Sequence, residues 1–281
     1  MSFLERYHMK KFLLLIILMI FISASALSET IVTSIKPLAL VLESICGSQF
    51  EIRVLMENTN PHLYQLKVSD VKSLYDADLI VLSGIEEWID KAKELFPEKV
   101  MVFSDGIFEQ ASKQDQHLWL DPVYTVLFAH QLYKEISSTY PEFSQILREN
   151  WKNFADEVFA NLSLWYEKLS PLRKKTLLEL HPALIHFAKR FDLGDIVFLE
   201  SGHEEGLTTK KINEVSKLIK EKQIRYLITE SNIESSTVIN LAQQLKLPVV
   251  EIDVLASNSR TYVEFINSLV NALIAAENTH R

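Results

Sequence analysis

The feature of this sequence that most constrains its fold is a long segment, residues 141–169, in which apolar side chains recur at helical spacing. The segment contains no glycine, and no proline after Pro141. Its apolar residues follow one another three or four positions apart, which places them on one face of a single helix: Phe143, Leu147, Trp151, Phe154, Val158, Leu162, Trp165 and Leu169. Such a helix is about 40 Å long at 1.5 Å per residue. We therefore predict that it bridges two lobes, the alternative being a core helix within one lobe.

The segments on either side of this helix repeat one order of elements. Each contains a helical pattern, a short apolar run, a second helical pattern and another short apolar run; the runs are 79–82 and 100–103 in the first segment, and 226–229 and 249–252 in the second. Short β-rich runs alternating with helices indicate parallel sheets of βαβ type. We predict an α/β fold of two similar lobes, with an N-terminal lobe at 29–140, the bridging helix at 141–169 and a C-terminal lobe at 170–281.

The first 28 residues have the order of a secretory signal peptide. Arg6, Lys10 and Lys11 precede the apolar run 12–22, and small residues follow at 23–28. The run is shorter than the about 20 residues that span a bilayer, so we favour a cleaved signal peptide over a retained anchor. No cysteine stands near the cleavage point to carry a lipid anchor. We expect an exported, periplasmic protein whose mature chain begins near Glu29.

Charge and cysteine content narrow the class of protein further. The formal net charge is −8, and removal of residues 1–28, which carry three basic residues and one acidic residue, makes it about −10. An acidic exported chain is not expected to bind nucleic acid. Cys46 is the only cysteine, so the chain cannot form an internal disulfide.

Three histidines stand next to an end of a predicted strand. His62 follows the strand-like run 50–56, His181 follows the run 174–180, and His117 precedes "LWLDP", in which we expect "LWL" to be a buried strand. Asp253 ends the run 249–252 in the second lobe. Ligands of parallel α/β sheets bind outside the carboxyl ends of the strands, so these four side chains are candidate metal ligands.

Three imidazoles and one carboxylate are a suitable tetrahedral shell for zinc, and imidazole also suits copper, nickel and iron. Other acidic and histidine side chains are alternatives, most of which we interpret as belonging to a solvated loop: Glu200, His203, Glu204, Glu205 and Glu230. His186 lies five residues beyond His181, which turns a helix about 140° away from the starting face. We do not expect it to be a co-ligand.

Taken together, these segments resemble the metal-receptor solute-binding proteins of ABC importers for zinc and manganese. The similar segments cover nearly all of the mature chain in order: "VTSIKPLALVLESICG", "NPHLYQLKVSDVKSLYDADLIVLSGIEEW", "DQHLWLDP", "ELHPALIHFAKRFDL" and "VVEID". The resemblance implies two α/β lobes bridged by a long helix, with His62, His117, His181 and Asp253 as metal ligands. Manganese receptors of this kind commonly have a glutamate at the third position, so His181 favours zinc (Zn2+) over Mn2+.

The sequence departs from the family at three places. The segment before His117, "GIFEQASKQDQ", has no histidine, so no metal-collecting loop is expected there. The disulfide of some zinc members cannot form with one cysteine. The family's "DPLG" after the aspartate is "DVLA" in this chain, which makes Asp253 the least secure of the four ligands, with water or another carboxylate as its alternative.

The resemblance implies a monomeric, non-enzymatic zinc receptor that passes its metal to a membrane permease driven by a separate ATPase subunit. The chain has no "GxxxxGK[ST]" phosphate-binding loop of its own. Three alternatives remain: a manganese or iron receptor on the same scaffold, a surface adhesin, and a secreted zinc hydrolase, although no "HExxH" is present.

Overall fold

The computed structural model describes residues 29–57, 59–105, 117–200, 208–231, 233 and 235–279. The predicted signal peptide, residues 1–28, lies outside the described residues, as do His203, Glu204 and Glu205. No helix among the described residues has both the length and the apolar character needed to cross a membrane.

The N-terminal lobe is built on a parallel sheet of four strands in the order β2-β1-β3-β4. The strands are β1 (Glu29–Ile35), β2 (Phe50–Met56), β3 (Leu79–Leu82) and β4 (Val100–Val102). Three of the helices of this lobe connect the strands: α2 (Lys36–Cys46), α3 (Val68–Asp76) and α4 (Ile89–Leu95). Leu74 of α3 and Ala92 of α4 pack with Val32 and Ile80 in one cluster, whereas α2 packs on the opposite face of the sheet.

The C-terminal lobe repeats this topology with a second parallel sheet, in the order β6-β5-β7-β8. Its strands are β5 (Leu177–Glu179), β6 (Ile196–Phe198), β7 (Leu227–Glu230) and β8 (Val249–Ile252). Its helices are α7 (Ile185–Arg190), α8 (Thr209–Glu221), α9 (Ser235–Leu245) and α10 (Tyr262–Thr279). The predicted fold class, two similar α/β lobes with parallel sheets, is confirmed.

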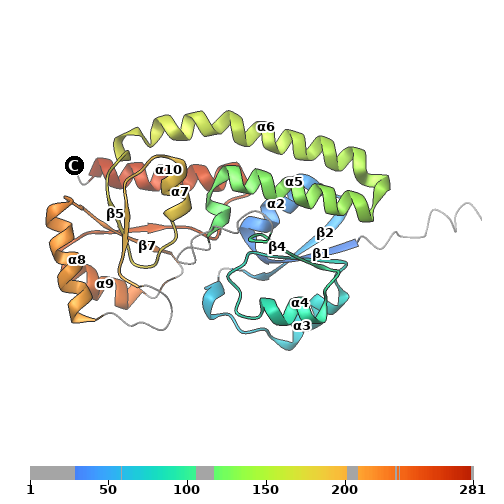
Figure 1. The fold of residues 1–281 in the computed structure, drawn as a ribbon, viewed down its shortest axis with the longest axis horizontal. Coiled ribbons are helices and arrows are strands. Elements are labelled where there is room, and N and C mark those ends of the chain that lie inside the picture. Colours follow the sequence, from blue (N-terminus) through green and yellow to red (C-terminus); the bar gives the residue numbers. More distant parts are fainter. Residues whose placement is uncertain are drawn as a thin grey trace, which may run out of the picture.

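The long apolar stripe forms one helix that runs along both lobes (Figure 1). A 3-10 turn η3 (Pro141–Phe143) leads into the 25-residue helix α6 (Ser144–Lys168), and a second turn η4 (Ser170–Leu172) follows it. The stripe faces inward, where its buried members include Leu147, Phe154, Val158 and Trp165. The helix contacts α2 and α5 (Pro122–Thr139) of the N-terminal lobe and α10 of the C-terminal lobe. Its apolar face therefore ties the two lobes together.

The segment "LWL" is buried as expected, but the prediction that it forms a strand is wrong. Leu118–Leu120 forms a 3-10 turn, η2, whose backbone bonds are local: Leu120 N donates to His117 O and Asp121 N donates to Leu118 O. The chain turns at this point because Asp121 caps α5 directly, accepting hydrogen bonds from the backbone N–H groups of Val123 and Tyr124. The apolar run is buried because it lies between the lobes and not because it joins a sheet.

The lone cysteine lies in the core of the N-terminal lobe. Cys46 ends α2, is free and is fully buried. Burial raises the pKa of its thiol to about 12. The thiol therefore stays protonated and is a small apolar side chain in the core.

Candidate metal centre

His62 is held at the carboxyl end of β2 by a short turn. Residues Pro61–Leu63 form a 3-10 helix, η1, and the side chain of Asn60 accepts a hydrogen bond from His62 N at 3.0 Å. Pro61 is buried beneath the turn. The imidazole is therefore presented by a locally fixed backbone, while its ring remains half-buried at the lobe junction.

His117 is the most enclosed of the three histidines, with 2% of its surface exposed. It precedes η2, and its ring lies 5.0 Å from the ring of Trp119. Trp119 is fixed across the lobes, because its Nε1 donates to Val254 O at 2.9 Å and its carbonyl accepts from the hydroxyl of Tyr262 at 2.8 Å. The position of His117 is thus set by contacts from both lobes.

His181 projects from the loop after β5. The buried carboxylate of Glu179, at the end of that strand, accepts hydrogen bonds from the backbone N–H groups of Ala183 at 2.9 Å and Leu184 at 3.3 Å. These bonds close the loop around His181. Glu179 is therefore a positioning residue for the third histidine, which sequence reasoning did not single out.

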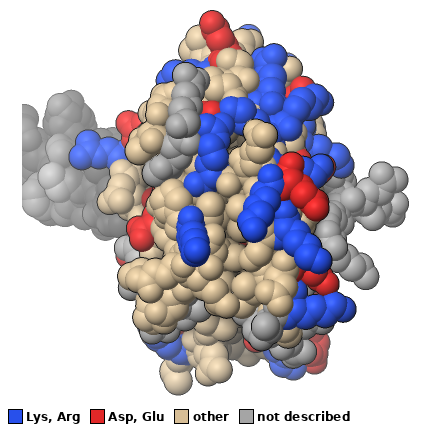
Figure 2. Space-filling model, turned by 90° about the vertical axis from the view of Figure 1, so that its left-hand side faces the viewer, with Lys and Arg blue, Asp and Glu red and all other residues tan. Residues whose placement is uncertain are grey.

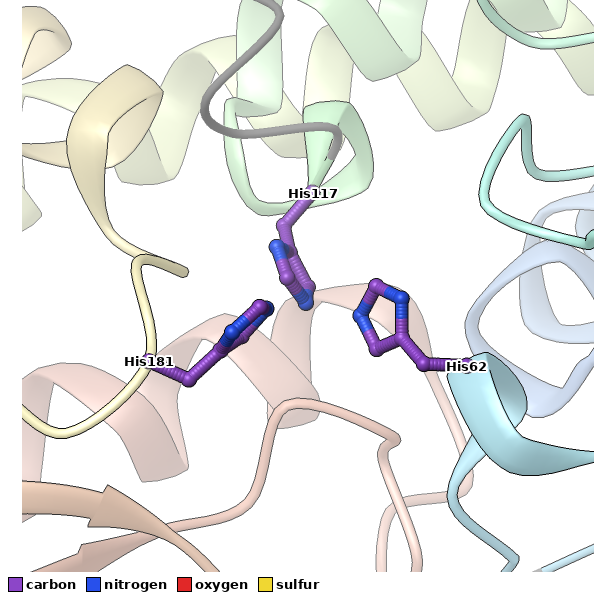
Figure 3. A group of neighbouring side chains, drawn as sticks. All are labelled: His62, His117 and His181. Atoms are coloured by element: carbon purple, nitrogen blue, oxygen red, sulfur yellow. The ribbon is translucent and has the colours of Figure 1, made fainter. Parts of the chain in front are cut away.

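The structure brings the three predicted histidines together at the junction of the lobes (Figure 3). The ring centroid of His62 lies 5.5 Å from that of His117 and 4.9 Å from that of His181, and the rings of His117 and His181 are 5.5 Å apart. One ring nitrogen of each residue lies within 4.8 Å of the other two. Tetrahedral zinc at about 2.05 Å from each nitrogen requires separations of roughly 3.4 Å, so small rotations of these side chains suffice to bind one ion.

Asp253 follows β8 as predicted, but the close group of ligand atoms among the described residues consists of the histidines and does not include it. Its carboxylate accepts hydrogen bonds from Leu255 N at 3.0 Å, Ser257 N at 2.6 Å and Ser257 Oγ at 3.2 Å. A carboxylate has about four acceptor positions. The Asp253 side chain therefore shapes its own loop and retains acceptor capacity for a metal.

Glu230 is the second carboxylate of the site. It ends β7 and is 5% exposed, and its Oε1 lies 3.9 Å from Nε2 of His117. The interpretation of its segment as solvated loop does not apply to this residue. The run "YLITE" contains the signal that could have found it, because its final residue continues a strand into the sheet edge that carries the site.

The remaining histidines of the described part of the chain lie elsewhere. His186 is buried on α7 with its ring 5.8 Å from that of Tyr124, and it is not part of the close group. His130 lies exposed on α5, with its ring 4.7 Å from that of Trp151.

A separate hollow lies at the opposite, amino end of the C-terminal strands. A cavity of about 520 Å³ is lined there by Lys175, Lys222, Arg225 and Glu277 among others, with no histidine in its wall. Lys175 and Arg225 both pair with the buried Glu277. Lys and Arg side chains gather on this end of the molecule (Figure 2). The cavity is therefore cationic and unsuited to a metal cation. The histidine cluster is the candidate metal centre because its ligand atoms lie close together.

Two α/β lobes, a rigid bridging helix and a trihistidine cluster at the lobe junction define a metal-binding receptor of the two-lobe type. The family model for the zinc-uptake complex component A, periplasmic (ZnuA), matches residues 31–276, and the chain belongs to this family. The protein is thus a metal-binding component of an ABC-type zinc or manganese uptake system. The family resemblance seen in the sequence is confirmed.

Individual relatives agree with this placement. A protein of Thermotoga maritima, provisionally named as metal-binding, is 30% identical over 271 residues, covering 94% of this chain and 98% of the relative. The manganese ABC transporter substrate-binding lipoprotein PsaA of Streptococcus pneumoniae is 22% identical and covers 74% of each chain. The periplasmic zinc-binding protein TroA of Treponema pallidum has the same fold, with a TM-score of 0.80 at 18% identity over 89% of this chain and 99% of that one.

Proposed function

We propose that this protein is the extracytoplasmic receptor of a high-affinity zinc importer. It binds one zinc ion, its transported substrate, between the lobes and delivers the ion to a membrane permease that works with a separate ATPase subunit. The observation that carries the proposal is the cluster of His62, His117 and His181, which offers three neutral nitrogen donors within reach of one ion.

The donor set favours zinc over manganese. Zinc readily takes imidazole nitrogen in a four-coordinate shell, whereas manganese is better suited by carboxylate, carbonyl and water oxygens in an octahedral shell. The relatives include one named for manganese and one named for zinc. The choice therefore rests on the third histidine, His181, in place of an oxygen donor.

The fourth position of the shell is proposed to be filled by Asp253. The residue follows β8 at the carboxyl edge of the C-terminal sheet, the edge from which His181 also projects. Asp253 retains acceptor capacity beyond its three loop hydrogen bonds. Glu230, 3.9 Å from His117, is the competing carboxylate.

The remaining features of the proposal concern the form in which the protein works. It is exported to the periplasm with cleavage of residues 1–28, acts as a monomer and catalyses no reaction. Its partners are the metal ion, the permease and, through the permease, the ATPase subunit.

The test is metal binding by the mature chain purified without chelator. Metal analysis should find one zinc per chain, and zinc should compete for the site against a chelator far more effectively than manganese. The His117→Ala variant should bind zinc at least about 100-fold more weakly, because a ligand contributes more than the 10–100-fold typical of residues that support ligands. His130→Ala, which changes an exposed histidine on α5, is the matched control. Equal zinc affinity in the two variants would show that the site is misplaced.

A further inference from the structure

Large apolar side chains lie exposed along one face of α3 and the turn before it. Leu63 is 68% exposed, Val68 90%, Val71 37% and Tyr75 56%. Positions 68, 71 and 75 share one face of the helix, while Leu74 on another face is buried in the lobe. We call Leu63, Val68, Val71 and Tyr75 the α3 stripe. Large exposed apolar side chains grouped on one element in this way are typical of an interaction site.

Among the described residues, only the N-terminal lobe has such a stripe on this helix; the equivalent helix of the C-terminal lobe does not. Helix α8 follows β6 in the C-terminal lobe as α3 follows β2 in the N-terminal lobe. The described exposed side chains of α8 are all polar or charged: Lys210, Asn213, Glu214, Lys217, Lys220 and Glu221. Two helices with the same place in the same topology therefore carry opposite surfaces, so the fold itself does not require apolar exposure there.

The stripe begins at the metal centre. Leu63 is the neighbour of His62 in the chain, and both belong to the three-residue turn η1. The turn is fixed locally by the bond from His62 N to Asn60. A partner that covers Leu63 and the adjoining face of α3 therefore contacts the segment that presents a candidate metal ligand. That helix lies on the side of the lobe away from α6 (Figure 1), so the bridging helix leaves this approach open.

We infer that the α3 stripe is the surface by which the N-terminal lobe docks on its membrane permease, an inference that rests on the proposed function. The occupant is the permease because the component that receives the ion must touch the rim of the site that holds it. The contact is apolar, in keeping with the core of a transient interface. Displacement of η1 by the docked partner would move His62 directly, which couples docking to release of the metal.

The test uses Val68→Asp in the full chain. Val68 is the first residue of α3, where an acidic side chain is favoured by the helix dipole, so the fold and the metal centre are left intact. The matched control is Leu164→Asp, at a side chain that is 54% exposed. Leu164 belongs to α6, a helix that lies on the other side of the molecule from α3 (Figure 1). Val68→Leu keeps the position apolar. Each variant replaces the wild-type gene in the source organism, uptake of radioactive zinc at limiting zinc is measured, and zinc affinity is measured on the purified variants.

If the α3 stripe docks on the permease, Val68→Asp should retain wild-type zinc affinity, and its rate of zinc uptake should fall by roughly tenfold. A loss of this size is typical of a residue central to an interface. Leu164→Asp and Val68→Leu should transport like the wild type. If Val68→Asp takes up zinc like the wild type, the docking proposal is overturned, while the proposed zinc receptor is unaffected. The same conclusion follows if Val68→Asp loses uptake only in proportion to a loss of zinc affinity. A wild-type protein that neither binds zinc nor supports its uptake would overturn the proposed function, and the docking proposal with it.

Discussion

The two carboxylates near the histidines differ in their surroundings, and this difference decides how each can serve a metal. Asp253 accepts three hydrogen bonds from its own loop, so its removal changes loop conformation as well as any metal contact. Glu230 is buried at the end of β7, with its carboxylate 3.9 Å from His117. A buried carboxylate beside an imidazole strengthens the binding of a cation there even without direct coordination.

We predict that Glu230→Gln and Asp253→Asn both weaken zinc binding, because each removes a negative charge near the cation. Each loss should be about 10–100-fold if the residue supports the shell, and greater for the residue that is the fourth ligand. Chelator competition on the two variants measures this directly. If Asp253 is the fourth ligand, Asp253→Asn should lose more zinc affinity than Glu230→Gln. A larger loss of affinity in Glu230→Gln would instead assign the fourth position to Glu230.

Asp70 is a buried carboxylate with a structural role. Burial alone would raise its pKa, but hydrogen bonds from the Tyr64 hydroxyl at 2.6 Å, Lys67 N at 2.8 Å and Ser69 Oγ at 3.3 Å hold that pKa below its usual range. Burial, together with this carboxylate, raises the pKa of Tyr64 to about 12. The folded state therefore binds the Asp70 proton more weakly than the unfolded chain does, and ionised Asp70 stabilises the start of α3.

The Asp70→Asn variant should lower the free energy of unfolding by about 1.5–3 kcal/mol at pH 7, the range for a hydrogen bond to a charged group. This contribution is present in full above the usual aspartate pKa of about 3.9 and is lost as the pH falls through the lowered folded-state pKa. The difference between wild type and variant should therefore disappear in acid. Urea unfolding at several pH values measures it, with Asp76→Asn, an exposed partner of Lys72 on the same helix, as the control. A difference between wild type and variant that does not shrink as the pH falls below about 3.9 would contradict the assignment.

Among the elements, α6 carries the mechanical connection between the lobes through its buried face. Phe154 is 4% exposed and its ring lies 5.8 Å from that of Tyr262 of α10. Trp165 is fully buried, and its Nε1 donates to Asn267 of α10 at 2.9 Å. Phe159 of the same helix is 47% exposed. The helix α6 thus carries one phenylalanine on its packed face and another on its solvent-exposed face.

We predict that Phe154→Ala lowers the free energy of unfolding by about 3–5 kcal/mol, since it leaves a cavity between α6 and α10. The control, Phe159→Ala, should cost less than about 1 kcal/mol. Both values follow from denaturant unfolding monitored by circular dichroism. Equal losses at the two positions would mean that the packed face of α6 does not hold the lobes.

At this scale the sequence predicted α6 to within a few residues, because its apolar spacing is local information. It failed at "LWL", where three consecutive apolar residues are consistent with either a strand or a buried turn. Trp119 is buried by Val254 and Tyr262, which lie 135 and 143 residues away in the chain. His62 and His181 were found because they follow strands, and His117 because it stands beside a buried apolar run. The burial of Glu230 depends on how the lobes pack and has no local pattern.

In the whole molecule, the lobes are joined by contacts that need no metal. The Arg190 guanidinium of the C-terminal lobe donates to the buried Asp121 carboxylate at 2.8 Å. Lys36 of α2 donates to Ser257 O, in the loop shaped by Asp253, at 2.9 Å. Trp119 donates to Val254 O at 2.9 Å. These hydrogen bonds and the bridging helix α6 all connect the two lobes across the junction that holds the metal centre. The lobes can therefore tilt slightly but cannot swing apart.

The metal-free and zinc-loaded proteins should therefore have nearly the same overall dimensions. We predict a change in radius of gyration below about 1 Å on zinc binding, measured by small-angle X-ray scattering, because a rigid connection permits only small shear or tilt. In Arg190→Ala the loss of one bond across the junction should let the metal-free form expand, whereas Lys189→Ala, which changes the exposed neighbouring side chain, should not. Contraction of several ångströms in the wild type would instead require lobes that open freely about a hinge, and would mean that α6 and the contacts across the junction do not restrain the lobes.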